Sequence, residues 1–139
     1  MKNLTGLDKY EKVRPLGKGA AGEVYLYKSY IDGRNYAIKE INLFGLDAKD
    51  RQAAFSEITF LKVLIGPTII KFVENFNTEE SIYVVMEYAA KGSLEQALNR
   101  KISSGKHFTK QQILRIMVHL ILAVMIMHKK KILHRDIKT

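Results

Sequence analysis

The chain has 139 residues, of which 47% are hydrophobic and 27% charged, and its formal net charge is +9. This balance is typical of a globular protein and excludes a disordered chain, and the length suits one ordinary domain or half of a large one. The absence of cysteine excludes disulfides and thiolate metal sites. The positive charge favours an anionic partner, and nucleotide phosphate, nucleic acid and acidic protein surfaces all qualify.

The N-terminus and the hydropathy pattern bear on location. The first residues, MKNLTGLDKY, lack the apolar core of a secretory signal. No run reaches about eighteen consecutive apolar residues, so we expect no membrane-spanning segment. The sequence therefore predicts a cytoplasmic or nuclear protein without a membrane partner.

Alternating apolar and polar residues predict three successive strands early in the chain, at residues 11–19, 22–30 and 35–41. In the second strand, Val24 and Leu26 fall on one face and Tyr25 and Tyr27 on the other. The pair Asp32-Gly33 is a strong hairpin signal, so it predicts a tight turn between the second and third strands.

A helix and two more strands follow. Residues 46–65 predict a helix with Asp47 as its N-cap. Residues 68–76 and 81–88 then predict two strands joined by the polar stretch NTEE. Composition changes after residue 88, where we place a hinge or linker at Glu87 to Gly92.

The second half is predicted to be helical. Residues 93–102 form a short amphipathic segment, and Thr109 and Gln112 make a capping box ahead of an apolar run at 113–128. Only Arg115 and His119 interrupt that run, so it predicts a helix covered on all sides inside a domain rather than a membrane segment.

The stretch LGKGAAGEV at 16–24 has the pattern G-x-G-x-x-G-x-V, with Gly17, Gly19 and Gly22. Closely spaced glycines let backbone N–H groups approach a phosphate. A dinucleotide-binding fold is disfavoured because a strand follows where a helix should begin, and Glu23 excludes a Walker loop. A phosphate-binding loop between antiparallel strands and an ordinary flexible hairpin both remain open.

Two charged residues lie inside apolar patterns. Strand alternation places Lys39 on one face with Ala37 and Ile41. In the helix, Glu57 falls within the apolar stripe, whose members are Ala54, Ile58, Leu61 and Ile65. A buried charge is costly unless it is paired, although long side chains also reach water by extending. We expect Lys39 and Glu57 to pair, with the lysine near the phosphates of a nucleotide bound at the glycine loop.

Near the C-terminus, Asp136 follows His134-Arg135 and precedes Lys138. A buried loop aspartate can orient or deprotonate a hydroxyl, and a nearby lysine can neutralise charge on a transferring phosphoryl group. The three lysines at 129–131 lack an aromatic stacking platform, which disfavours nucleic-acid binding and favours a solvated turn at a helix end.

In this order, the motifs G-K-G-A-A-G-E-V, Y-A-I-K, the Glu57 helix, V-M-E-Y and H-R-D-I-K resemble a eukaryotic protein kinase over residues 10–139. The resemblance implies an α+β fold. Residues 10–88 would form an N-lobe with a five-stranded antiparallel sheet and one helix. A nine-residue extension (1–9) would precede it, and the incomplete start of a mostly helical C-lobe would follow at 93–139.

The resemblance also implies roles for individual residues. The three glycines would cover the ATP phosphates, and Lys39, paired with Glu57, would bind the α- and β-phosphates. Asp136 would be the catalytic base, with Arg135 its loop neighbour, and Lys138 would belong to the same catalytic loop. The residues implied around adenine are Leu16, Val24 and Ala37 in the pocket, Met86 as gatekeeper, and Glu87 to Ala89 as the hinge whose backbone hydrogen-bonds the base.

The motif D-I-K resembles serine/threonine kinases, and SGKHFTKQQIL and KKKILHRDIKT look like NIMA-related kinases. Two departures stand out. Ala21 replaces the aromatic residue that many kinases carry at the loop tip, and Gly66-Pro67-Thr68 replaces His-Pro-Asn, which bears on how the base of the Glu57 helix docks.

The family pattern expects a metal-binding asparagine two residues beyond Thr139 and an Asp-Phe-Gly site further on, so no metal ligand is expected within this chain. We therefore expect an N-terminal piece of a serine/threonine protein kinase domain that uses ATP and Mg²⁺, with a protein as substrate. The alternative is a catalytically inactive fragment that binds a nucleotide or a partner. In either case the apolar helix would lack the helices that should cover it.

Overall fold

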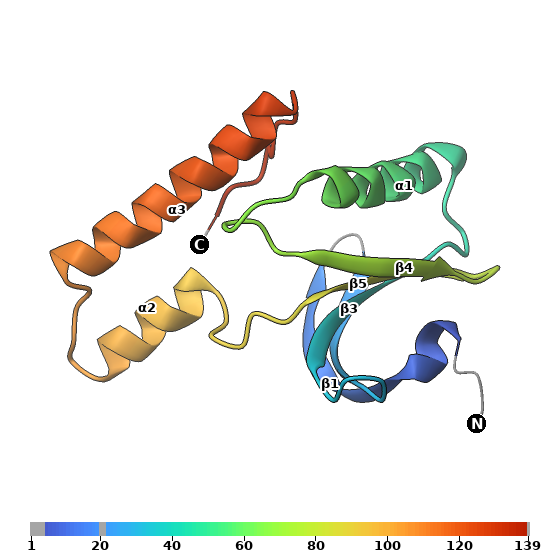
Figure 1. Ribbon diagram of the computed structural model, residues 1–139, viewed down its shortest axis with the longest axis horizontal. Helices are drawn as coiled ribbons and strands as arrows, with labels where there is room; N and C mark the ends of the chain where they lie inside the picture. Colours follow the sequence, from blue (N-terminus) through green and yellow to red (C-terminus); the bar gives the residue numbers. More distant parts are fainter. Residues whose placement is uncertain (1–4, 20–21, 139) are drawn as a thin grey trace. The chain divides into compact units, whose positions relative to one another are not determined.

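The structure is a computed structural model and describes residues 5–19 and 22–138 (Figure 1). The chain divides into two compact units. Unit 1 comprises the described residues up to Val63 together with Ile70–Tyr88, and unit 2 comprises Leu64–Ile69 and the described residues from Ala89 onward.

Unit 1 is built on a five-stranded antiparallel sheet with strand order β1-β2-β3-β5-β4. The predicted order of three strands, one helix and two strands is confirmed, as is the predicted fold class. The elements are η1 (Gly6–Lys9), β1 (Tyr10–Gly19), β2 (Gly22–Ser29), β3 (Asn35–Asn42), α1 (Ala48–Val63), β4 (Phe72–Asn77) and β5 (Ser81–Glu87).

The two predicted turns of the sheet are present. Gly33 has φ 70°, a left-handed conformation that costs glycine little, and its N–H donates to the Ser29 carbonyl at 2.9 Å between β2 and β3. Between β4 and β5, the Thr78 N–H donates to the Ser81 carbonyl at 2.8 Å. Each turn therefore joins two consecutive antiparallel strands by a short connection.

The two faces of the sheet carry separate apolar clusters. On one face α1 packs against the strands and forms a core of Ile41, Leu43, Ala54, Ile58, Ile82 and Val84. The opposite face gathers Tyr10, Tyr27, Ile38 and Val85, with Tyr25 and Tyr83 against them. The prediction that Tyr25 and Tyr27 share a face is confirmed. Because both faces are covered, unit 1 buries side chains such as Ile38 and Val85 completely.

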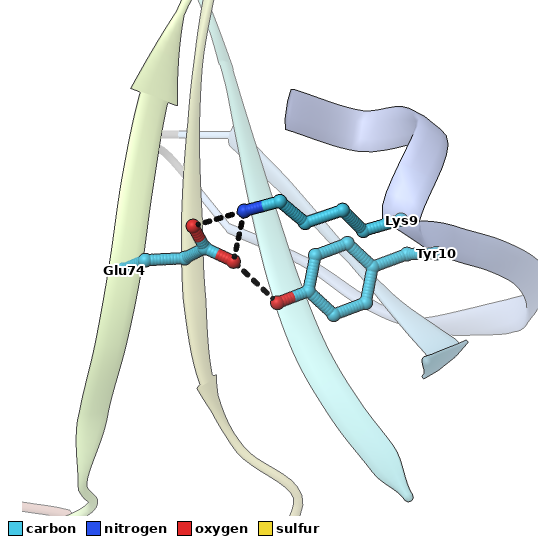
Figure 2. A network of polar contacts seen from close by, with 3 residues as sticks. All are labelled: Lys9, Tyr10 and Glu74. Carbon is cyan, nitrogen blue, oxygen red and sulfur yellow. Dashed lines mark hydrogen bonds and ion pairs between the residues drawn. The ribbon is translucent and has the colours of Figure 1, made fainter. Parts of the chain in front are cut away.

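Polar side chains join the two edges of this sheet, since β1 and β4 are its outermost strands. Figure 2 shows the Glu74 carboxylate of β4 accepting hydrogen bonds from the Tyr10 hydroxyl at 2.7 Å and from the Lys9 ammonium at 2.9 Å. Five strands therefore curl until the first and the last meet over the aromatic face, which the normal twist of a sheet favours.

The predicted N-cap of α1 is confirmed, because the Asp47 carboxylate accepts a hydrogen bond from the Asp50 N–H at 2.8 Å. Ala54 and Ile58 are buried and Leu61 packs beside them, as the apolar stripe predicts. The prediction for Ile65 is wrong: the helix ends at Val63, and Ile65 is 83% exposed. The apolar period of 3.6 residues continues past the point at which the chain leaves the helix.

Unit 2 contains α2 (Leu94–Ser103) and α3 (Lys110–Lys129). The predicted capping box is present at α3, where the Gln112 N–H donates to the Thr109 hydroxyl at 3.2 Å and the Gln112 side chain accepts from the Thr109 N–H at 3.0 Å. Ser93 and Gln96 form the same motif at α2, which the sequence analysis did not identify.

Contrary to the prediction of a fully covered helix, α3 is largely exposed, and Met127 is its one buried residue among those described. Its large exposed side chains include Ile113, Leu114, Met117, Val118, Leu120, Ile121, Leu122 and Met125. Among the described residues, unit 2 supplies little that covers these side chains.

The length and composition of α3 also bear on the prediction that no membrane span exists. Of the helices in the described residues, α3 alone is long and apolar enough to cross a membrane, a property shared with buried helices of soluble proteins. Counting uninterrupted apolar residues misses this, because Arg115 and His119 break the run without making the helix polar.

One close contact ties the segment Leu64–Ile69 to α3 within unit 2. A Cβ added to Gly66 would meet the end of the Ile126 side chain, so a larger residue there would require that side chain to move. The Gly66-Pro67-Thr68 departure therefore lies where that segment packs on α3, and the Thr68 hydroxyl is buried there without a hydrogen-bond partner among the described residues.

Candidate functional site

The glycine-rich stretch forms the end of the β1–β2 hairpin. Gly17 pairs with Val24, Lys18 with Glu23 and Gly19 with Gly22 in an antiparallel register. The alternative of a loop that opens a helix is thereby excluded, as the sequence predicted. Ala20 and the predicted departure at Ala21 lie outside the described residues.

The three glycines differ in what surrounds them. Gly22 has φ 141°, and a Cβ there would collide with the Glu40 carbonyl of β3, so the fold itself requires glycine. Among the described residues, nothing lies within 4 Å of a Cβ added at Gly17, and at Gly19 the nearest atom is 3.9 Å away. Open space beside these two backbones is what a phosphate needs in order to approach their N–H groups.

The predicted pair of Lys39 and Glu57 is present, with 2.6 Å between the Lys39 Nζ and the Glu57 Oε1. It joins the middle of β3 to α1. The Lys39 side chain is 16% exposed and the Glu57 side chain 41% exposed, so the lysine is the more enclosed partner. Because a charge-assisted bond of this length orients the ammonium, Lys39 is fixed on the α1 side of the sheet.

The strand register places the predicted adenine-lining residues in two adjacent cross-strand rows. Val24 pairs with Lys39, and Lys39 with Val84. In the next row, Ala37 lies between Leu26 and Met86. Paired residues in antiparallel strands point to the same face, so Val24, Ala37 and Met86 share the face of Lys39. Leu16 is partly buried at a bulge of β1 beside Gly17.

At the end of β5, one backbone group of the predicted hinge already makes a hydrogen bond within the protein. The Glu87 N–H donates to the Lys71 carbonyl at 2.9 Å, so Glu87 has only its carbonyl to offer a base. In unit 2, the Ala89 carbonyl accepts from the Gly92 N–H at 3.0 Å, while the Ala89 N–H makes no hydrogen bond within the described part of the chain.

A cavity of about 850 Å³ lies between the end of the glycine hairpin and α1, entirely within unit 1. Its walls include Gly19, Gly22, Ile41, Ala54 and Glu57. The glycine hairpin and the carboxylate that holds Lys39 thus border one open space. The sequence analysis predicted that the glycine stretch and the pair of Lys39 and Glu57 lie near one another, but it could not predict the size of this cavity.

Asp136 lies in unit 2 in an exposed loop. Its carboxylate accepts from the Lys138 ammonium at 2.9 Å, and this hydrogen bond and charge lower the pKa of Asp136. Its N–H donates to the His134 imidazole at 3.2 Å. Arg135 has φ 64°, uncommon for a residue other than glycine, and gives the loop a sharp bend. Contrary to the expectation of a buried aspartate, Asp136 is exposed among the described residues.

The described residues contain no group of three or more His, Cys, Asp or Glu side chains placed to hold a metal ion. The predicted Mg²⁺ is therefore not matched by a set of protein ligands in this part of the chain.

Two polar contacts of unit 1 were not anticipated. The Glu23 carboxylate accepts hydrogen bonds from the Lys18 ammonium at 2.9 Å and from the Tyr25 hydroxyl. The hydrogen bond from Tyr25 has the larger effect and that from Lys18 the next, and together they lower the pKa of Glu23. Arg14 donates to the Tyr88 hydroxyl at 3.1 Å. No sequence signal indicates either contact, because each depends on the hairpin register or on strands that are not adjacent in the sheet.

A sequence model described as the protein kinase domain matches residues 10–139. The chain is 38% identical over 133 residues to serine/threonine-protein kinase Nek1 of Mus musculus, covering 96% of this chain and 11% of that protein. It is 36% identical to Nek5 of Homo sapiens, covering 95% and 18%, and 34% identical to nekl-2 of Caenorhabditis elegans, covering 95% and 39%. The chain thus spans between 11% and 39% of the length of these relatives.

Proposed function

Because the chain belongs to the protein kinase family, we propose that it holds the nucleotide for an enzyme that transfers the γ-phosphoryl group of ATP to a protein. The acceptor would be a serine or threonine hydroxyl, since the Nek relatives carry that specificity in their names and the sequence shares the D-I-K motif. The relatives confirm the predicted likeness to NIMA-related kinases, whereas the activity of this chain is the proposal.

The bond between Lys39 and Glu57 carries the proposal. A lysine held by a helix carboxylate has a fixed position from which its remaining N–H groups can donate to the α- and β-phosphates. The open backbone at Gly17 and Gly19 would supply further N–H donors above those phosphates. Most catalysis of phosphoryl transfer is positioning and charge stabilisation, which is what these groups offer.

Asp136 would orient the acceptor hydroxyl and take its proton. The hydrogen bond from Lys138 lowers the pKa of Asp136, and an ionised carboxylate can accept a hydrogen bond from a hydroxyl. When the substrate binds, Lys138 would move from Asp136 toward the phosphoryl group, whose negative charge is the stronger attraction. Bound Mg²⁺ would neutralise phosphate charge, and the described residues offer no protein ligand set for it.

Nucleotide binding by the 139-residue chain is the first test. We expect ATP to raise the melting temperature of the chain and Lys39→Met to weaken binding about tenfold or more, because a charge-assisted bond to phosphate is lost. Lys28→Met is the matched control: Lys28 is an exposed lysine of β2 and should leave binding unchanged. Equal affinity of Lys39→Met and the unsubstituted chain would refute the proposed role of Lys39.

Turnover is the second test. With Mg-ATP and a generic protein substrate, we expect the 139-residue chain to bind nucleotide without measurable phosphotransfer, because the described residues form no metal site. Phosphotransfer that Lys39→Met abolishes would show that this segment is itself an enzyme. Phosphate found on tyrosine rather than on serine or threonine would contradict the proposed acceptor.

A further inference from the structure

Arg14 and Tyr88 make a contact that the kinase resemblance does not assign. The Arg14 Nη2 donates to the Tyr88 hydroxyl at 3.1 Å, and the Arg14 Nη1 lies 3.4 Å from the Pro15 carbonyl, which accepts from it. One guanidinium therefore joins the start of the glycine stretch to the residue that follows β5.

The strand register shows where this contact runs. Arg14 pairs with Leu26, Leu26 with Ala37, and Ala37 with Met86, so the four residues form one row across β1, β2, β3 and β5. Residues paired in this way share a face, which here is the face of Val24 and Lys39. The hydrogen bond to Tyr88 therefore links the edge strand β1 directly to the end of β5, although β2 and β3 lie between these two strands in the sheet.

The position of this row matters for a purine. Ala37 and Met86 are predicted to line the adenine pocket, and Leu26 beside Arg14 is buried although it belongs to neither apolar cluster. The row therefore runs outward from Ala37, a predicted adenine-lining residue, and ends at Arg14. The hydrogen bond between Arg14 and Tyr88 is exposed, so it lies at the outer end of that row.

We propose that Arg14 and Tyr88 form the outer rim of the adenine pocket and slow the release of a bound adenine nucleotide. This inference rests on the proposed function. The hydroxyl of Tyr88 is a neutral acceptor, so the contact aligns Arg14 without cancelling its charge. A rim of this kind covers the edge of the base and ribose, and it must open before the ligand leaves. Arg14 and Tyr88 are positioning residues and touch no reacting atom.

The inference is tested by the rate of nucleotide release from the 139-residue chain. ATP carrying a fluorophore on its γ-phosphate would be displaced by excess unlabelled ATP in a stopped-flow instrument. Losing one exposed hydrogen bond should raise the release rate about two- to tenfold in Arg14→Met and in Tyr88→Phe. The double variant should be no faster than either single variant, because both remove the same contact.

Controls separate the rim from a general charge effect and from damage to the fold. Lys28→Met removes an exposed positive charge from β2 and should release nucleotide at the unsubstituted rate. The affinity for adenosine, which carries no phosphate, should fall by the same factor as that for ATP in Arg14→Met. The melting temperature without ligand should change little in both rim variants, since Arg14 is exposed and Tyr88→Phe removes only a hydroxyl whose hydrogen bond is exposed.

The outcomes distinguish the two proposals. If the unsubstituted chain does not bind ATP, nucleotide binding by this chain is refuted, and the rim with it. If it binds ATP and the rim variants release it at the unsubstituted rate, the rim is refuted while nucleotide binding stands. If only Arg14→Met is faster, and only with ATP, Arg14 acts on the phosphates and the rim is also refuted.

Discussion

Unit 1 and unit 2 differ in how much of their own apolar surface they cover. Unit 1 packs a helix on one face of a sheet and aromatic side chains on the other, and buries Ile38, Val84 and Val85 almost completely. In unit 2, α3 exposes most of its apolar side chains. A sheet that curls can enclose a core from nearby sequence, whereas a helix that is apolar on all sides needs several neighbours.

The largest expected effect is a matched truncation in the two units. Ile38→Ala should destabilise unit 1 by about 2–5 kcal/mol, because a fully buried side chain leaves a cavity. Ile121→Ala in α3 should change stability by less than about 0.5 kcal/mol, because Ile121 is 53% exposed. Urea unfolding followed by circular dichroism measures both. Similar losses would show that α3 is covered in solution.

A second comparison separates what unit 1 needs for folding from what it needs for function. Gly22→Ala should cost about 1–3 kcal/mol, because of its positive φ and the collision with the Glu40 carbonyl. Gly17→Ala should stay within about 0.5 kcal/mol in stability yet weaken ATP binding. Thermal unfolding with and without ATP measures both; unimpaired ATP binding by Gly17→Ala would remove the case for phosphate contact there.

The next effect concerns the helix that lacks tertiary support. Thr109→Ala removes the N-cap of α3 and should cost about 1 kcal/mol of helix stability. Because little packing holds α3, the loss should appear as reduced helical circular dichroism at low denaturant. Ser103→Ala, an exposed serine at the end of α2, is the control and should leave the helical signal unchanged.

The smallest effect is a pH dependence of unit 1. Burial alone would raise the pKa of Glu74, but hydrogen bonds from Tyr10 and Lys9 outweigh it and lower that pKa below 4.5. A lowered pKa stabilises the fold above the unfolded value, and this contribution is lost as the pH falls through the folded value. Glu74→Gln should therefore flatten the loss of stability below about pH 4.5.

Acid titration of the unfolding midpoint measures that slope. Glu79→Gln, in the exposed turn between β4 and β5, should keep the unsubstituted slope. Tyr10 makes stability depend on pH at high pH as well. Burial, followed by the hydrogen bond to Glu74, raises the pKa of Tyr10 above its ordinary 10.0. Its contribution to stability is therefore lost as the pH rises from 10.0 toward the raised pKa. An unchanged acid limb in Glu74→Gln would show that the contact between sheet edges does not form in solution.

The sequence predicted most of the fold because its signals were local. Strand alternation, the Asp32-Gly33 turn and two cap residues, Asp47 and Thr109, identified the elements and their ends to within a few residues. The predictions were wrong where an apolar pattern in the sequence did not correspond to burial in the structure. Ile65 keeps the apolar spacing beyond the end of α1, and the pattern of α3 predicts burial without stating what would cover it.

The candidate site was predicted in part. The pairing of Lys39 with Glu57 followed from two charges inside apolar patterns, because each lacked a partner in its own element. The contact between Arg14 and Tyr88 could not be predicted in this way. Both residues are ordinary surface residues in the sequence, and they meet only because the sheet brings the edge strand to the end of β5.

The sequence by itself determined the order of the elements, their faces and the family, because these depend on residue spacing over short stretches. Only the tertiary structure decided which glycine the fold requires. Gly22 lies against the carbonyl of Glu40, eighteen residues further along the chain (40 − 22), whereas Gly17 faces open space. The distinction follows from the twist and register of three strands, which bring distant backbones together at one glycine and not at the other.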